Sequence, residues 1–370
     1  MSRFPRPDYQ PLDLYAPDRR LVALDLSDNT NLWGAPGAAL AAVQAADSDM
    51  LTRYPSLYAD DLKNAIHQRY GVPLDSITTG CGSDDVLDSA FRAAGPEGGT
   101  VRFAGPTFSM IEPLALMNGR QAVEVPWSRA LQSPRTLLEE DPVIVYVCRP
   151  NNPTGTSAPR SWLDKLLGAA GGSRGPLLIV DEAYADFAAE TLLAEAPGIP
   201  NLLVTRTLSK AFGLAGFRVG FGVATPEVAR EVEKSRGPFK VSSLSEKAAV
   251  AALQDEDDWA MRTIAECVAA RERLFLALKE RGLEPLRSCT NFILIPVPDG
   301  SARTWNDALR TYGVAVRPFP ACPDVGDALR VTVAPWPMLE RFLEALDSVL
   351  AEGQVPAPEA ALAARVRNPG

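Results

Sequence analysis

The sequence predicts an α/β protein with a large, doubly wound domain and a smaller α+β domain. Short apolar runs alternate with amphipathic helical segments between about residues 76 and 224, a pattern typical of a sheet with helices on both faces. The run 143–147 is apolar throughout, as expected of a strand that is buried on both faces. After Ala224 helices come first and strands follow, which favours a separate α+β unit.

The N-terminal region predicts little regular structure before its first helix. Residues 1–25 contain several prolines and no hydrophobic period, so they are expected to form a loosely structured arm. Residues 26–34 form a polar loop in which Asn and Asp can bond their own backbone. Helices are expected at 36–46 and 58–70.

The central region predicts alternating strands and helices. Strands are expected at 76–79, 100–103, 121–125, 143–147, 177–180, 202–205 and 217–224, and helices at 83–94, 108–117 and 161–167. Ser83 is expected to be the N-cap of its helix, with acidic residues in the first turn. Because such sheets bind ligands at the carboxyl ends of their strands, the polar clusters at those ends mark the predicted site.

The C-terminal region predicts the smaller domain. Helices are expected at 226–235, 245–253, 257–281, 302–312 and 337–350, and strands at 292–297, 314–317 and 329–333. We therefore predict an N-terminal arm at 1–30 that joins the small domain, a large domain at 31–253 and a small domain at 254–352. Residues 353–370, rich in Ala and Pro, are expected to form a flexible tail.

Composition excludes several classes of function. A net charge of −9 disfavours a nucleic-acid partner, because an acidic surface repels phosphodiester backbones. No apolar run approaches the length of a membrane span, and no charged-then-apolar leader is seen, so no membrane partner is expected. The five cysteines lack a Cys-x-x-Cys spacing, which favours a reducing cytoplasm over disulfides or a zinc site.

The single histidine, His67, limits the available chemistry. A Ser-His-Asp triad or a two-histidine metal site would have to use it. It falls in a helical stretch, where a surface or packing role is expected. Catalysis should therefore depend on Lys, Asp, Tyr or Arg side chains, or on a cofactor.

The segment 205–222 carries the most informative pattern. Between two strand-like runs lie two hydroxyls, Thr207 and Ser209, together with Lys210 and Arg218. Hydroxyls and an arginine can cradle a phosphate, and a lysine held beside it can form a Schiff base with an aldehyde. The alternative is a strand–turn–strand with a surface lysine and a surface arginine.

Other strand ends add matching groups. The helix that opens after Gly80 offers backbone N–H groups to a phosphate, although the glycine spacing of a dinucleotide fingerprint is absent. Asp181 ends a buried strand and requires a cationic partner. Asn152 and Tyr184 offer neutral hydrogen bonds, and Phe108 a flat apolar face. Together these groups indicate pyridoxal 5′-phosphate (PLP), which needs a lysine, an acid and a phosphate cradle.

These motifs resemble those of the fold-type I PLP enzymes of aminotransferase class I/II, most closely the histidinol-phosphate aminotransferase subgroup. The resemblance covers roughly residues 26–350 and implies a three-layer α/β/α large domain with a mixed, mostly parallel sheet. It is carried by Gly-Ser-Asp-Asp at 82–85, Asn-Asn-Pro-Thr-Gly at 151–155, Asp-Glu-Ala-Tyr at 181–184, Thr-Leu-Ser-Lys-Ala-Phe-Gly-Leu-Ala-Gly-Phe-Arg at 207–218 and Leu-Arg-Val-Thr-Val at 329–333.

The resemblance implies a role for each matching residue. Lys210 would bind the cofactor covalently and shuttle a proton, Asp181 would pair with the pyridinium, and Asn152 and Tyr184 would hold the phenolic oxygen. Lys210, Asp181 and Tyr184 would form the catalytic set. The residues expected at the cofactor phosphate are Ser83, Asp84, Thr207, Ser209 and Arg218, with Phe108 stacked on the ring.

Further implied roles concern the substrate and a second subunit. Tyr54 would reach the phosphate of the other subunit's cofactor, in a homodimer with shared active sites. Arg330 would bind the acidic group of the substrate, with Asn31 and Arg317 as secondary candidates. Arg149 stands where a small residue is common; it could add a cation near the site or be a surface arginine on a loop.

The implied activity is transamination between an amino acid or amine donor and a 2-oxo acid acceptor, with histidinol phosphate and 2-oxoglutarate as one candidate pair. A PLP-dependent lyase, similar to threonine-phosphate decarboxylase, shares nearly every cofactor contact and stays open as an alternative. A non-catalytic PLP-fold module is a third hypothesis, disfavoured because Lys210 is present and no helix-turn-helix segment is seen. The loop 29–34 reads Asn-Thr-Asn-Leu-Trp-Gly, which departs from the usual pattern of the subgroup and bears on the choice of substrate.

Overall fold

The computed structural model describes residues 4–353 and 355–356, so most of the predicted tail at 353–370 lies outside the described residues. Within them, a seven-stranded sheet has the order β2-β8-β7-β6-β5-β3-β4. Its strands, in that order, are Ile77–Cys81, Val219–Ala224, Leu202–Thr207, Leu177–Asp181, Ile144–Cys148, Thr100–Gly105 and Gln121–Pro126. Strand β8 runs antiparallel to the other six, which are parallel to one another, and this confirms the predicted mixed, mostly parallel sheet.

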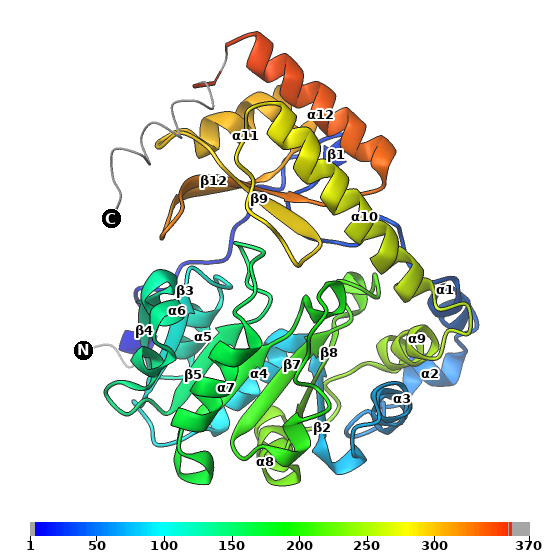
Figure 1. The fold of residues 1–370 in the computed structure, drawn as a ribbon. Helices are drawn as coiled ribbons and strands as arrows, with labels where there is room; N and C mark the ends of the chain where they lie inside the picture. Colours follow the sequence, from blue (N-terminus) through cyan, green and yellow to red (C-terminus); the bar gives the residue numbers. More distant parts are fainter. Residues whose placement is uncertain (1–3, 354, 357–370) are drawn as a thin grey trace.

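Helices cover both faces of this sheet (Figure 1). Alternate residues of β5 belong to two separate cores: Val145 and Val147 pack in one, and Ile144 and Tyr146 in the other. The first core includes α6 (Trp127–Gln132) and α7 (Arg160–Ala169), and the second includes α4 (Ser83–Ala93), α5 (Ile111–Met117) and α8 (Pro226–Arg236). This arrangement is the predicted three-layer α/β/α architecture. The helices α1 (Gly37–Gln44), α2 (Ser48–Thr52), α3 (Asp60–Tyr70) and α9 (Ser243–Leu253) lie beyond the β2–β8 edge.

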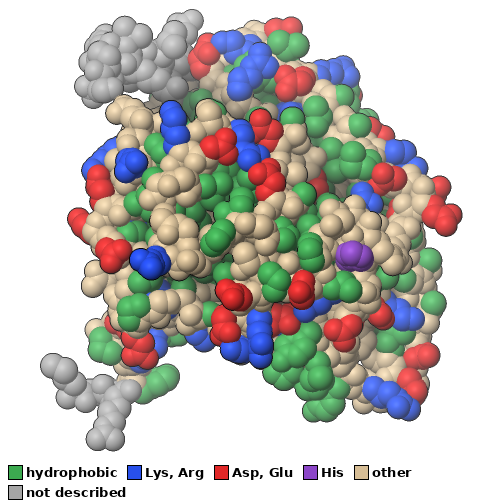
Figure 2. Space-filling model, turned by 60° about the horizontal axis from the view of Figure 1, so that its bottom comes forward, with side chains coloured by type: hydrophobic (Ala, Val, Ile, Leu, Met, Phe, Trp, Pro, Cys, Tyr) green, Lys and Arg blue, Asp and Glu red, His purple; other side chains and the backbone are tan. Residues whose placement is uncertain are grey.

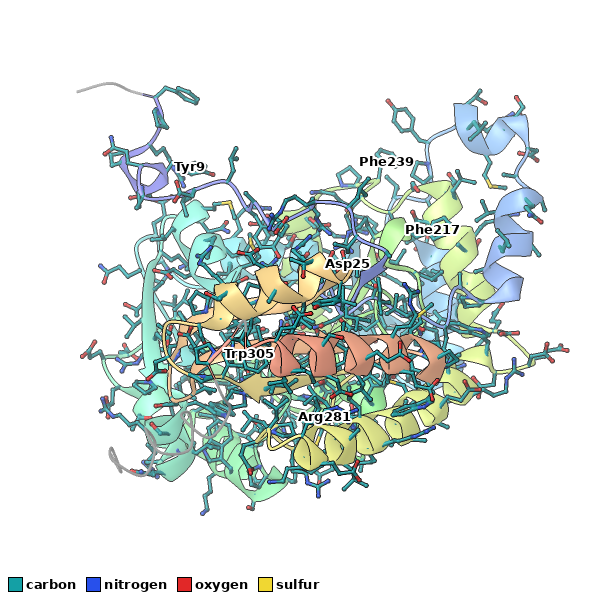
Figure 3. All side chains as sticks on the ribbon, turned by 90° about the horizontal axis from the view of Figure 1, so that it is seen from above. Tyr9, Asp25, Phe217, Phe239, Arg281 and Trp305 are labelled. Atoms are coloured by element: carbon teal, nitrogen blue, oxygen red, sulfur yellow. The ribbon has the colours of Figure 1, made fainter. Side chains whose placement is uncertain are left out.

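A second, antiparallel sheet has the order β11-β12-β9, with strands Arg317–Cys322, Gly326–Thr332 and Phe292–Pro296. It is covered by α10 (Trp259–Glu280), α11 (Ala302–Thr311) and α12 (Trp336–Ala351), which lie side by side when seen from above (Figure 3). The short strand β1 (Leu24–Asp25) pairs in parallel with β10 (Val314–Ala315), so the N-terminal segment is joined to the C-terminal part of the chain.

Three local predictions were wrong. Ser83 is the first residue of α4 and not its N-cap; Gly82 takes that position and makes no side-chain cap bond. Phe108 does not begin a helix, because α5 starts at Ile111. The single strand expected at 314–317 is two strands that pair with different partners. None of the helices formed by the described residues has the length and hydropathy needed to cross a membrane.

Candidate active site

A cavity of about 700 Å³ opens between the carboxyl ends of the central strands and the β11–β12 hairpin. The N-terminal segment supplies part of its wall through Tyr15, Arg19 and Asp28. This volume is within the usual range for a small-molecule site. The predicted site residues that line the cavity are Ser83, Asp84, Phe108, Asn152, Asp181, Tyr184, Thr207, Ser209, Lys210, Arg218, Arg317 and Arg330.

One end of the cavity concentrates groups that favour an anion. Arg218 Nη1 donates to Ser209 Oγ at 3.1 Å, and Thr207 Oγ1 donates to the same oxygen at 3.0 Å. Arg218 Nη2 forms an ion pair of 3.2 Å with Asp84 in the first turn of α4. Because the first N–H groups of a helix have no partners within it, the start of α4 adds donors at the same end.

Glycines make this close approach possible. A Cβ on Gly82 would lie 2.5 Å from Arg218 Nη2, and the φ of +82° also disfavours any other residue. A Cβ on Gly220 would lie 2.2 Å from the backbone nitrogen of Ser83. The guanidinium of Arg218 and strand β8 can therefore both lie directly against the N-terminus of α4.

Asp181 is a buried carboxylate, 4% exposed, at the end of β6. Its oxygens accept hydrogen bonds from Tyr146 Oη (2.7 Å), the backbone N–H of Ala183 (3.0 Å) and Thr205 Oγ1 (3.2 Å). Burial raises the pKa of Asp181, while the Tyr146 bond opposes this increase. All of these donors are neutral, so the described residues leave its charge without a cationic partner. An uncompensated buried charge is costly, which favours a cationic ligand here.

Lys210 follows β7 and faces the same cavity. Its Nζ donates to the backbone carbonyl of Asp28 at 3.3 Å and lies 5.9 Å from the ring centroid of Tyr184. Burial, with a contribution from the nearby charge of Arg330, lowers the pKa of Lys210 to about 8. An appreciable fraction of the amine is then unprotonated near neutral pH, as a nucleophilic lysine requires.

Tyr184 and Asn152 are arranged as donors. Asn29 Nδ2 donates to the Tyr184 hydroxyl at 3.0 Å, so the hydroxyl's own proton is free to point elsewhere. Burial raises the pKa of Tyr184 above its ordinary value and keeps that proton in place. Asn152 Oδ1 accepts from Arg330 Nη1 at 2.6 Å, which leaves the amide N–H groups of Asn152 to donate.

Arg330, 8% exposed in β12, lies at the other end of the cavity. Besides Asn152, its hydrogen-bond partner is the carbonyl of Ser27 at 2.7 Å, and its Nε has no partner among the described residues. Two aromatic rings, Phe292 and Phe319, lie 5.3 and 5.4 Å from its guanidinium carbon. A buried guanidinium held only by neutral oxygens is suited to an anionic ligand.

Some predicted residues lie elsewhere. Tyr54 is 84% exposed and stacks on Phe239 at 4.9 Å, at the rim of the molecule where Figure 3 labels Phe239. Asn31 does not line the cavity; its side chain joins the carbonyl of Ala211 to the backbone N–H of Trp33. Arg149 is neither at the cavity nor on the surface: it is 2% exposed and binds the carbonyl of Ala158 and the carboxylate of Glu190.

His67 has the role expected for it. It is exposed, and it is the only side chain coloured as histidine in Figure 2. Its Nδ1 lies 2.8 Å from the carbonyl of Val72, a contact local to the end of α3. It therefore takes no part in the cavity.

Several residues that line the cavity or contact its lining residues were not predicted. Tyr146 and Thr205 hold Asp181, and Asn29, not Asn31, is the asparagine of its loop that lines the cavity. Tyr146 and Thr205 alternate with apolar residues that point to the opposite face of the sheet, so side-chain alternation could have placed them beside Asp181. Arg19, ion-paired with Asp28, carries no sequence signal, because its position depends on how the N-terminal segment folds back.

The chain is similar to proteins of a known family. Residues 21–346 match the family described as aminotransferase class I and II. The chain is 37% identical to histidinol-phosphate aminotransferase 2 of Ralstonia nicotianae over 343 residues, which is 90% of each chain. It is 33% identical to an aromatic amino acid aminotransferase of Streptomyces avermitilis, covering 84% of this chain and 86% of that protein.

A solved structure provides a similar comparison. The histidinol-phosphate aminotransferase of Sinorhizobium meliloti, in complex with pyridoxal-5′-phosphate, superposes with a TM-score of 0.87 at 27% identity. The match covers 95% of this chain and 98% of that one. The resemblance therefore extends through both sheets.

Proposed function

The chain belongs to the aminotransferase class I and II family and is a PLP-dependent aminotransferase, and we propose that it takes the amino group of histidinol phosphate and passes it to a 2-oxo acid. The observation that carries this proposal is the trio of Lys210, Asp181 and Arg330 in one cavity. The lysine amine is partly neutral, the carboxylate has no cationic partner, and the guanidinium has no anionic one. A cofactor with a pyridinium and a substrate with an acidic group would compensate both charges.

The donor set fits PLP. When bound, PLP supplies an aldehyde that receives the amino group and a protonated pyridine that draws electron density from the substrate. Its phosphate would lie at the start of α4, held by Arg218, Ser209 and Thr207, where Gly82 leaves room for the guanidinium. Asp181 would pair with the pyridine nitrogen. Tyr184 and Asn152 would donate to the phenolic oxygen, and Phe108 would cover the ring.

Lys210 would act as both the attachment point and the proton carrier. Its lowered pKa leaves part of the amine unprotonated, so Nζ can accept the proton that leaves the Cα of the substrate. The carbonyl of Asp28 at 3.3 Å gives the Nζ protons an acceptor and restrains the side chain on the cavity side. Nζ can then return the proton at the position where the product requires it.

Arg330 would determine the class of substrate. Its free Nε and its neutral partners suit either a carboxylate or a phosphate, and one site must accept two substrates in turn. Arg317, whose Nη2 donates to Tyr15 Oη at 3.2 Å, lies close enough to line the same cavity. The relatives named for histidinol phosphate and for aromatic amino acids provide the two donor candidates.

We also propose a homodimer that shares its active sites. Several large hydrophobic side chains are exposed near α1, α2 and the 237–240 loop: Leu40, Leu51, Tyr54, Leu57 and Phe239. Burial of such side chains against a second copy would be favourable. Tyr54 is exposed on this surface and does not line the cavity of its own chain, and it would reach the phosphate end of the partner's cavity.

The proposal is tested with PLP-loaded protein and a panel of donors. Histidinol phosphate, phenylalanine and glutamate are each supplied with a 2-oxo acid acceptor, and the new amino acid and any carbon dioxide are measured. We expect amino transfer that requires the acceptor, with the highest kcat/KM for histidinol phosphate. Release of carbon dioxide without need of an acceptor would instead support a lyase, and a preference for phenylalanine would assign an aromatic donor.

A further inference from the structure

The shortest hydrogen bond to Asp181 comes from a tyrosine on the neighbouring strand. Tyr146 Oη lies 2.7 Å from Asp181 Oδ2, whereas the two donors to Oδ1 are 3.0 and 3.2 Å away. Tyr146 is fully buried in β5 and packs in the core formed with α4 and α5. Its hydroxyl position is therefore fixed by the packing of its ring.

The register of the sheet explains why this tyrosine can reach the carboxylate. In the parallel pair β5–β6, Tyr146 is opposite Ile179 and Cys148 is opposite Asp181. Tyr146 and Asp181 therefore point to the same face, one pair of side chains apart along the strands. A long aromatic side chain covers this distance and places its hydroxyl behind the carboxylate, on the sheet side of the cavity.

We propose that Tyr146 is a positioning residue of the transamination reaction, whose hydroxyl fixes the orientation of Asp181 so that its unoccupied lone pair faces the cofactor. The proposal rests on the proposed function. A carboxylate has about four acceptor positions. Tyr146, Thr205 and the Ala183 N–H occupy three of these positions. Asp181 lines the cavity, so the fourth acceptor position is available to a ligand there.

Because the donor to Asp181 is neutral, the carboxylate can keep the pyridine ring protonated, and the protonated ring is what draws electron density from the substrate. A hydroxyl stabilises the carboxylate but leaves its full negative charge available to the pyridine nitrogen; a lysine or arginine at the same place would neutralise it. Burial and the adjacent Asp181 raise the pKa of Tyr146 well above its ordinary value, so the phenol keeps its proton and the direction of donation is fixed. Loss of the hydroxyl would raise the basicity of Asp181, and the shared proton would move from the pyridine nitrogen toward the carboxylate.

The test compares Tyr146→Phe with a matched loss of another buried hydroxyl. Thr78→Val in β2 of the same sheet removes an Oγ1 that is buried without a hydrogen-bond partner and outside the cavity. Each protein is loaded with PLP labelled with ¹⁵N at the pyridine nitrogen. The ¹⁵N resonance, the dissociation constant for PLP, and kcat and KM with the best donor are then measured.

For Tyr146→Phe we expect the ¹⁵N resonance to move toward that of unprotonated pyridine. We expect kcat to fall about ten- to a hundredfold, which is the factor that corresponds to the net free energy of a hydrogen bond to a charged group. We expect KM for the donor to change little, because Tyr146 does not line the cavity. Thr78→Val should match the wild type in resonance and kcat.

A second substitution covers the case in which Tyr146→Phe does not fold or does not hold the cofactor. Tyr146→3-fluorotyrosine keeps the ring and its hydroxyl but makes the phenol a stronger donor, so the ¹⁵N resonance should move toward the protonated position. A ¹⁵N resonance unchanged from wild type in the variants that bind PLP, or a kcat loss shared by Thr78→Val, would overturn the proposal. Wild-type protein that binds PLP but transfers no amino group would instead contradict the proposed function.

Discussion

Arg330 Nη1 donates a hydrogen bond of 2.6 Å to Asn152 Oδ1, and this bond joins the two sheets across the cavity. Arg330 belongs to β12 of the antiparallel sheet, while Asn152 lies in the loop after β5 of the seven-stranded sheet. The residue proposed to bind the substrate is therefore coupled to a residue proposed to hold the cofactor. Substitution of the arginine should affect both functions.

We expect Arg330→Lys to lower kcat/KM for the amino donor and for the 2-oxo acid. Lysine keeps the charge but loses the paired N–H groups, and a charge-assisted bond of about 1.5–3 kcal/mol corresponds to a loss of about ten- to a hundredfold. The dissociation constant for PLP should also rise, because Asn152 loses its partner. Steady-state kinetics and PLP titration measure these effects.

Arg273→Lys provides the control for this substitution. Arg273 stacks on Trp336, 3.4 Å from the ring centroid, in the groove between α10 and α12, outside the cavity. It should keep wild-type kinetics. Wild-type efficiency of Arg330→Lys with both substrates would show that the anion is bound elsewhere.

The rate at which PLP attaches to the PLP-free protein should depend on pH through Lys210. The neutral amine is the nucleophile, and burial lowers the pKa of Lys210 to about 8. The neutral fraction is then about one tenth at pH 7 and about nine tenths at pH 9. The attachment rate, followed by the change in absorbance, should rise through pH 8 and level off above about pH 9. A rate that keeps rising past pH 10 would indicate a lysine with an ordinary pKa.

Gly82→Ala should weaken PLP binding through its phosphate. The new Cβ would displace the Arg218 guanidinium from the N-terminus of α4, and the backbone at φ +82° would also be strained. We expect the affinity for PLP to fall at least tenfold, since Arg218 loses a charge-assisted contact. The affinity for pyridoxal, which lacks the phosphate, should change much less.

Gly98→Ala separates the two causes of this effect. Gly98 has a similar φ of +75°, but a Cβ there would meet no atom within 4 Å. Its positive φ likewise disfavours a side chain, but there is no contact to Arg218, so both affinities should match the wild type. Equal losses for PLP and pyridoxal in Gly82→Ala would argue against a phosphate site at this position.

If the homodimer shares its active sites, two inactive variants should regain activity when their subunits are mixed and exchanged. In a hybrid of Lys210→Ala and Tyr54→Phe subunits, one site combines an intact Lys210 with an intact Tyr54 from its partner. In an equal mixture about half of the dimers are hybrids, so about a quarter of the wild-type sites are restored. Activity is measured at a PLP concentration too low to load Tyr54→Phe alone. No gain over the parents, after proven subunit exchange, would contradict sharing.

The central sheet could be predicted from local sequence because each of its strands has its own pattern. Apolar runs such as Ile144–Cys148 and Leu177–Asp181 can be buried only between two layers of helices. Polar residues at their carboxyl ends then had to meet at one edge. The predicted group of Asp181, Asn152 and Lys210 in one cavity follows from this rule.

The short elements could not be predicted in the same way. Helices α2 and α6, of five and six residues, have too few turns to show a hydrophobic period. The start of α4 was misplaced because a serine before acidic residues is a good cap, whereas Gly82 is required there by the close approach of Arg218.

The sequence by itself determined the layered fold, the family and the residues of the strand ends, since these depend on local periodicity and on short motifs. Only the tertiary structure decided which side chains lack a partner of opposite charge and that Tyr146 donates a hydrogen bond to Asp181. It also decided which polar residues line the cavity: Asn29 and Arg19 do, whereas Asn31 and Arg149 do not. The physical reason is that burial, charge compensation and hydrogen-bond distance depend on residues far apart in the chain. Asn152 and Arg330, separated by 178 positions, acquire their bond only when the two sheets are packed together.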